Sequence, residues 1–114
     1  MKIGVAERHA GVFVVTLEGE VDMSTSPEVR KALLPLFHDK AAHVVVDLKG
    51  VPYIDSSGIA TLVEGLQLSK RGGARFTLAG AGRTVEAVFD LAYLKSVFEM
   101  VPDVEGLFRG EGKA

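Results

Sequence analysis

Apolar residues follow two different spacings along the chain, and the two spacings alternate. Runs rich in β-branched and aromatic residues predict strands at 3–6, 12–17, 43–48, 75–79 and 96–100. Residues 9–11 lie between the first two runs and predict the turn of a hairpin. The run at 43–48 is almost continuously apolar, so we expect that strand to be buried on both faces of a sheet.

Segments with apolar residues at helical spacing lie between these runs. The first follows residues 24–28, which offer hydroxyl N-caps, a proline for the first turn and an acid near the positive helix end. The second begins after Asp55 and ends at two basic residues and two glycines. The expected apolar positions are Val29, Ala32, Leu33, Leu36 and Phe37 in the first helix, Ile59, Leu62, Val63 and Leu66 in the second, and Val85, Val88, Phe89 and Ala92 in a third. A last helical turn is predicted at 104–108, before a tail at 110–114 that we expect to fray.

The order of these elements, ββαβαβαβα, indicates an α/β fold. Strands that alternate with helices form parallel pairs, whereas the N-terminal hairpin adds an antiparallel pair. We therefore predict one domain over residues 1–114. Its core is a mixed, mainly parallel sheet of about four to five strands with helices packed against it.

The composition mainly argues against certain classes of function. The chain has no cysteine, and its three histidines show no ligand spacing, so we expect no metal and no cofactor. The net charge of −2 comes without a basic stripe, which argues against direct binding of nucleic acid. No apolar run is long enough to cross a bilayer and the N-terminus lacks a secretory signal, so we expect a cytoplasmic protein without membrane insertion.

The segment 44–65 carries the candidate chemistry, because a buried strand there leads to two serines at the start of a helix. Asp55 can cap that helix, and Gly58 allows a close approach in its first turn. A phosphate on Ser56 would lie where free N–H groups and the helix dipole favour negative charge. On chemistry alone, a capped helix in a tight turn explains these residues equally well.

Three features of the chain resemble the STAS domains, and especially the stand-alone anti-sigma-factor antagonists. One is Gly19-Glu20-Val21-Asp22 followed by Thr25, which resembles that family's loop before the first helix. Another is Val46-Asp47-Leu48 leading to Ile54-Asp55-Ser56-Ser57-Gly58, which resembles its phosphorylation motif. The third is the order of elements that follows. Together they cover essentially the whole chain.

The resemblance implies a STAS fold and a partner-switching mechanism. In that family the unmodified protein binds an anti-sigma factor that is also an ATP-dependent serine kinase, and this binding releases a sigma factor for transcription. Phosphorylation of the antagonist ends the binding, and a serine phosphatase reverses it. By position the acceptor is Ser56, and Ser57 ranks behind it. The implied partner-binding residues are Glu20, Asp22, Thr25, Asp55, Ser56, Ser57 and Gly58.

Some positions depart from the family pattern. Ala60 stands where a second glycine is common, Gly80-Ala81-Gly82 where a proline is common, and Ala92-Tyr93-Leu94 where Ser/Thr-Gly-Leu is frequent. Gly80-Ala81-Gly82 also partly matches a phosphate-binding loop, but Val85 takes the place of the third glycine, so we interpret it as a connection. These departures affect the expected identity of the binding partner more than the expected fold.

Several alternatives stay open. Without the resemblance, Glu20 and Asp22 are explained as two solvent-exposed acidic residues just after a strand. A second function for the same fold is a STAS subunit of a lipid-transport ABC system that binds the ATPase subunit. A third is a small nucleotide-binding or hydrolytic enzyme, but the chain offers no catalytic base, metal site or complete phosphate loop, so we expect no enzymatic activity. The oligomeric state is left open.

Overall fold

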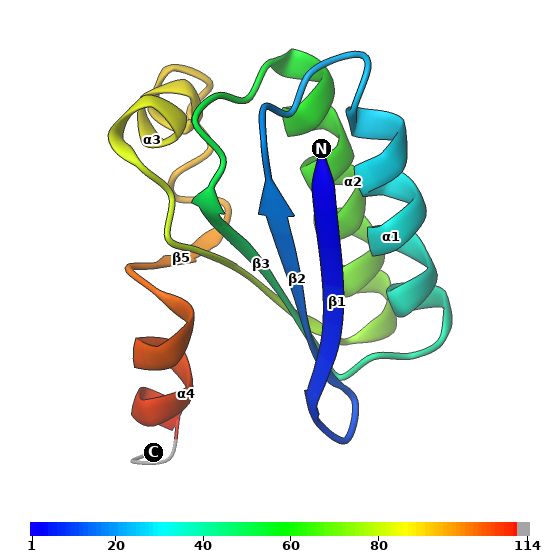
Figure 1. Ribbon diagram of the computed structural model, residues 1–114. Helices are drawn as coiled ribbons and strands as arrows, with labels where there is room; N and C mark the ends of the chain where they lie inside the picture. The colour runs from blue at the N-terminus through cyan, green and yellow to red at the C-terminus, as the bar shows by residue number, and fades with distance from the viewer. Residues whose placement is uncertain (112–114) are drawn as a thin grey trace.

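Within residues 1–111, five strands form one sheet, and their order across the sheet is their order along the chain (Figure 1). The computed structural model describes residues 1–111. The strands are β1 (Lys2–His9), β2 (Val12–Glu18), β3 (His43–Gly50), β4 (Arg75–Ala79) and β5 (Glu99–Val101). β1 is antiparallel to β2, and every later neighbour pair is parallel. The predicted mixed, mainly parallel sheet is therefore confirmed.

In the part of the chain that the structure describes, four helices connect or follow these strands: α1 (Ser26–His38), α2 (Ser56–Gly72), α3 (Arg83–Leu91) and α4 (Val104–Glu111). The predicted order of elements is confirmed, but some bounds differ. β1 is longer than 3–6, because it pairs with β2 along almost its whole length. α4 is longer than one turn and includes residues 110 and 111 of the expected frayed tail, while 112–114 lie outside the described residues.

The segment between α3 and β5 differs most from the prediction. Ala92 is exposed and lies past the end of α3, so it is not a core position. Residues 96–98 are not strand, because the N–H groups of Val97 and Phe98 donate to the carbonyl of Leu94 and close a turn. That turn places Phe98 in the core, where its ring meets Phe89 and Phe76 edge to face.

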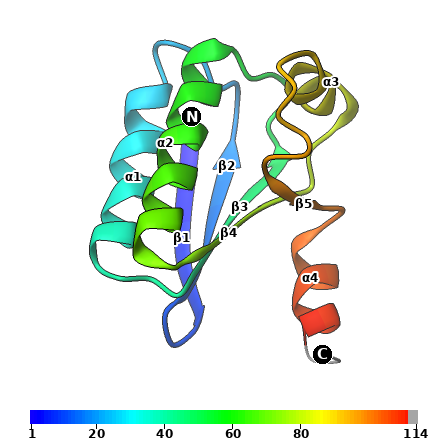
Figure 2. The ribbon, with the colours of Figure 1, turned by 180° about the vertical axis from the view of Figure 1, so that it is seen from behind.

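The two faces of the sheet are covered unequally. Alternate residues of β3 point to opposite faces, so Val44 and Val46 pack on the side of α1 and α2 while Val45 packs with α4. Seen from behind, α1 and α2 lie side by side along the sheet, and α4 lies apart from them beyond β5 (Figure 2). All three valines are fully buried, which confirms the expectation for this strand.

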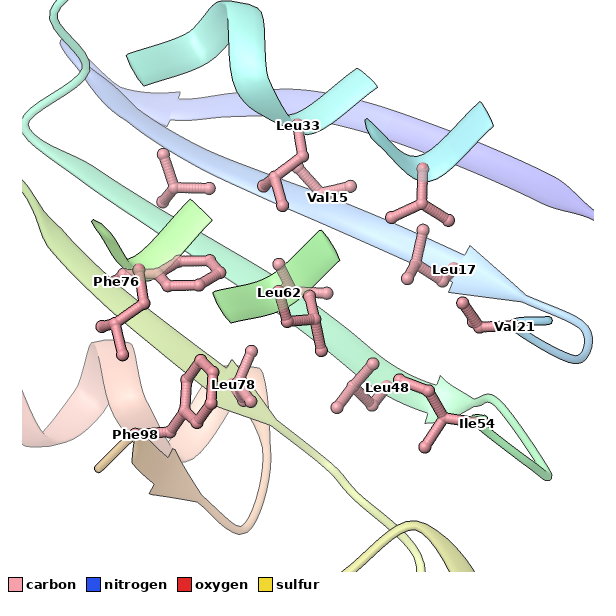
Figure 3. Packing of buried hydrophobic residues seen from close by; sticks show 14 of the residues in the cluster. Val15, Leu17, Val21, Leu33, Leu48, Ile54, Leu62, Phe76, Leu78 and Phe98 are labelled. Atoms are coloured by element: carbon pink, nitrogen blue, oxygen red, sulfur yellow. The ribbon is translucent and has the colours of Figure 1, made fainter. Parts of the chain in front are cut away.

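The larger core lies between the sheet and the pair α1 and α2, and it extends to the carboxyl ends of β2 and β3. There Val21 and Ile54 continue the line of buried side chains begun by Leu17 and Leu48 (Figure 3). Both are almost completely buried although they belong to loops. The core therefore reaches into the loops that carry the candidate site. No helix within residues 1–111 is long and apolar enough to span a membrane.

Candidate functional site

Two loops far apart in sequence are joined by backbone hydrogen bonds at this end of the sheet. The N–H of Val21 donates to the carbonyl of Tyr53, and the N–H of Asp55 donates to the carbonyl of Val21, each at 3.0 Å. Val21 and Ile54 thereby form an isolated parallel bridge. The bridge places the loop before α1 beside the start of α2, so the two predicted motifs form one surface.

Gly58 lies in the first turn of α2, directly against this bridge. A Cβ atom at Gly58 would lie 2.6 Å from Ile54 Cγ1 and 2.6 Å from Val21 Cγ1, far inside van der Waals contact. The residue is buried and its φ is not in the left-handed region. The sequence predicted a close approach here, and the structure shows that side chains of both loops make it.

Asp55 is the N-cap of α2. Its Oδ1 accepts hydrogen bonds from the N–H groups of Ser57 at 2.9 Å and Gly58 at 3.2 Å, and from the Ser57 hydroxyl at 2.6 Å. The Ser57 hydroxyl, followed by these two N–H groups, holds the pKa of Asp55 below its usual value. The sequence predicted free N–H groups near a phosphate on Ser56. For the N–H groups of Ser57 and Gly58 this prediction is wrong, because both already donate to Asp55.

The two serines differ in exposure and in their hydrogen bonds. The side chain of Ser57 is half-buried, and its hydroxyl donates to Asp55. Ser56 is exposed, at the first residue of α2. A group that approaches from solvent therefore reaches the Ser56 hydroxyl without breaking the cap.

Asp22 orders the neighbouring loop in a similar way. Its Oδ1 accepts from the N–H of Ser24 at 2.9 Å, from the Ser24 hydroxyl at 2.7 Å and from the N–H of Thr25 at 3.2 Å. The Ser24 hydroxyl and N–H are the main causes of a lowered pKa at Asp22. The carboxylate is thus charged and fixed in position.

Thr25 is the N-cap residue of α1, but it does not cap the helix as the sequence predicted. Its hydroxyl donates to the carbonyl of Glu20 at 2.8 Å and accepts the N–H of Asp22 at 2.9 Å. Its side chain makes no hydrogen bond to an N–H of α1. The Thr25 side chain therefore closes the loop 20–25 on itself, while its backbone carbonyl accepts the N–H groups of Glu28 and Val29 at the start of α1.

The surface formed by these loops is acidic. The negative charge of Asp22 weakly opposes the lowering of the Asp55 pKa, so the two carboxylates lie close enough to interact electrostatically. Glu20 is exposed beside them in sequence. Neither the segment 19–25 nor the segment 52–60 contains a lysine or arginine. Within the described residues, no three His, Asp or Glu side chains are grouped so that they could hold a metal ion.

Comparison with known proteins identifies the family of this chain. Residues 5–107 match the family model of the STAS domain. The chain belongs to the STAS domain family. One curated relative is the anti-sigma-B factor antagonist of Bacillus subtilis (strain 168), which is 29% identical over 92 residues, or 81% of this chain and 84% of that protein.

Solved structures show the same fold for this STAS domain. An anti-sigma factor antagonist from Mycobacterium paratuberculosis is 27% identical, with a TM-score of 0.82 over 96% of this chain and 93% of that one. The Bacillus cell fate determinant SpoIIAA in its phosphorylated form is 17% identical, with a TM-score of 0.75 over 95% of this chain and 98% of that one. The fold predicted from the resemblance is confirmed.

Two exposed apolar residues near the site of this STAS domain were not singled out from the sequence. Met23 follows Asp22 and is 80% exposed, and Tyr53 lies two residues before Asp55 and is 44% exposed. The signal was present in the sequence, because each apolar residue lies within two positions of a predicted acidic site residue. Spacing alone could not show that both side chains point outward.

Proposed function

We propose that this STAS domain is an anti-sigma-factor antagonist that binds an ATP-dependent serine kinase and is released from it by phosphorylation of Ser56. The observation that carries the proposal is the difference between the two serines. The Ser56 hydroxyl is exposed at the first residue of α2, whereas the Ser57 hydroxyl is bonded to the capping carboxylate. The curated relatives named anti-sigma factor antagonists, and a structural neighbour solved in a phosphorylated form, support the same function.

The phosphoryl transfer requires little from this chain except a positioned hydroxyl. The Ser56 oxygen attacks the γ-phosphorus of ATP, an O–P bond forms, the bond to the bridging oxygen breaks, and ADP leaves. The hydroxyl proton must pass to a base. Asp55 is a poor base, because three hydrogen bonds already hold its carboxylate in the charged form. The base and the cations that neutralise the triphosphate therefore belong to the kinase.

Phosphorylation adds about −1.5 to −2 charges to a surface that is already acidic. Asp55 directly precedes Ser56, Asp22 interacts electrostatically with Asp55, and two N–H groups of the α2 start are occupied by Asp55. A docked partner would have to desolvate the new phosphate among these carboxylates, and like-charge contacts of this kind cost several kcal/mol. The switch therefore acts on the interface and leaves the fold intact.

The remaining steps follow from this cycle. While the unmodified chain occupies the kinase, the sigma factor is free for transcription, and a serine phosphatase regenerates the unmodified chain. Because the cycle needs ATP and a sigma factor, the proposal places the protein in the cytoplasm. The chain has no catalytic role of its own.

The test is to incubate the purified chain with the kinase from its native cells and ATP, and to locate the phosphate by mass spectrometry. We expect phosphate on Ser56 in the wild-type chain and in Ser57→Ala, and none in Ser56→Ala. Phosphate on Ser57, or on neither serine, would refute the proposal. Co-purification of an ABC ATPase in place of a kinase would favour the transport alternative.

A further inference from the structure

Two exposed apolar side chains lie on the acidic surface beside the acceptor. Met23 is 80% exposed and Tyr53 is 44% exposed. They come from loops that are joined through the backbone, since the N–H of Val21 donates to the carbonyl of Tyr53. Single exposed apolar residues are common on proteins, so exposure alone is a weak observation. Met23 directly follows Asp22 and Tyr53 lies two residues before Asp55, so both belong to the two joined loops that carry these carboxylates, and this makes them informative.

The charge of this surface limits what can cover it. The surrounding segments 19–25 and 52–60 contribute three carboxylates and no lysine or arginine. A second copy of the chain would bring the same carboxylates against themselves, which disfavours self-association through this face. A nucleotide-dependent kinase has the complementary charge, because the cleft that holds a triphosphate must present cations.

We propose that Met23 and Tyr53 are the apolar anchors that hold the kinase on this surface, while the carboxylates steer its approach. This inference rests on the proposed function. A flexible methionine and an amphipathic tyrosine can both fill pockets in a partner, and buried anchors of this type carry most of the energy of an interface. Exposed charges at the rim act mainly on the association rate. The two groups should therefore affect different rate constants.

The test measures association and dissociation of the chain and the kinase by surface plasmon resonance at two salt concentrations. Met23→Ala and Tyr53→Ala should each raise the dissociation rate at least tenfold and leave the association rate nearly unchanged. Tyr53→Phe keeps the ring and should dissociate at nearly the wild-type rate. Glu20→Gln should instead lower the association rate and its dependence on salt.

Leu91→Ala is the matched control, because Leu91 is 81% exposed at the end of α3 and lies outside the segments 19–25 and 52–60. It should dissociate at the wild-type rate. The anchor assignment would be overturned if Met23→Ala and Tyr53→Ala both dissociated from the kinase at the wild-type rate. It would also be overturned if Leu91→Ala raised the dissociation rate as much as they do. In either case the proposed function would stand. If no kinase binds the wild-type chain, the proposed function and this inference fail together.

Discussion

Gly58 in α2 and Val21 in the loop before α1 pack so closely that no side chain fits between them. A Cβ atom on Gly58 would lie 2.6 Å from Val21 Cγ1, and Ile54 closes the same space from the other side. Because Val21 is also bonded through its backbone to Tyr53 and Asp55, this contact helps to fix the start of α2 against the loop before α1.

Gly58→Ala should therefore destabilise the protein. The added methyl group overpacks a buried contact, for which the expected loss is about 1–3 kcal/mol in the free energy of unfolding, measured with urea. Gly72→Ala is the control, because a Cβ atom there meets nothing within 4 Å. That change should be neutral or stabilise by up to about 1 kcal/mol. Equal effects of the two changes would contradict the packing described here.

Leu62 tests the orientation of α2. It is 1% exposed and belongs to the main core cluster, so Leu62→Ala should cost about 2–5 kcal/mol in unfolding free energy. Gln67 is exposed on the other side of the helix, and Gln67→Ala should stay within about 0.5 kcal/mol. Val63, which the sequence placed on the sheet-facing stripe with Leu62, is only half-buried, so Val63→Ala should fall between the two.

Substitutions that add or omit a charge at Ser56 test the proposed phosphorylation switch. Ser56→Asp should bind the kinase about a hundredfold more weakly than the wild-type chain, because a carboxylate is added beside Asp22 and Asp55. Ser56→Asn has nearly the same shape without the charge and should bind much more tightly than Ser56→Asp. Both variants should unfold at the wild-type urea midpoint. Equal binding of the Asp and Asn variants would show that charge is not what the interface rejects.

The cap of α2 should respond to pH in a predictable direction. Hydrogen bonds from the Ser57 hydroxyl and the N–H groups of Gly58 and Ser57 lower the pKa of Asp55. A carboxyl with a lowered pKa contributes stability above its unfolded pKa, and this is lost as the pH falls through its folded pKa.

As the pH falls below about 5, the wild-type chain should therefore lose stability relative to Asp55→Asn, whose side chain accepts the same hydrogen bonds without titrating. Urea unfolding of the two proteins at matched pH values measures this difference, since the other carboxyls titrate in both. Parallel pH profiles would mean that the Asp55 charge contributes nothing to the cap.

Tyr93 adopts a left-handed backbone conformation with φ of 59° and is 88% exposed. For a non-glycine residue this conformation costs about 1–2 kcal/mol. Glycine in turn loses about 0.5–1 kcal/mol more backbone entropy than alanine on folding. Tyr93→Gly should therefore raise the unfolding free energy by up to about 1 kcal/mol, whereas Tyr93→Ala keeps the Cβ atom and should not. A loss of stability in Tyr93→Gly would mean that the ring makes a stabilising contact.

The sequence by itself determined the type and order of the elements and the position of the acceptor motif. These depend on local features, such as the valine run of β3 and the capping aspartate before α2, which act within a few residues. The hydrogen bond that distinguishes Ser57 from exposed Ser56 is also local to the α2 cap. The tertiary structure decided how the loops meet. Only the pairing of Val21 with Ile54, 33 positions apart, brings Asp22 close to Asp55. The late start of β5 has the same origin, because burial of Phe98 against Phe89 and Phe76 draws residues 96–98 out of the strand that their propensity favours.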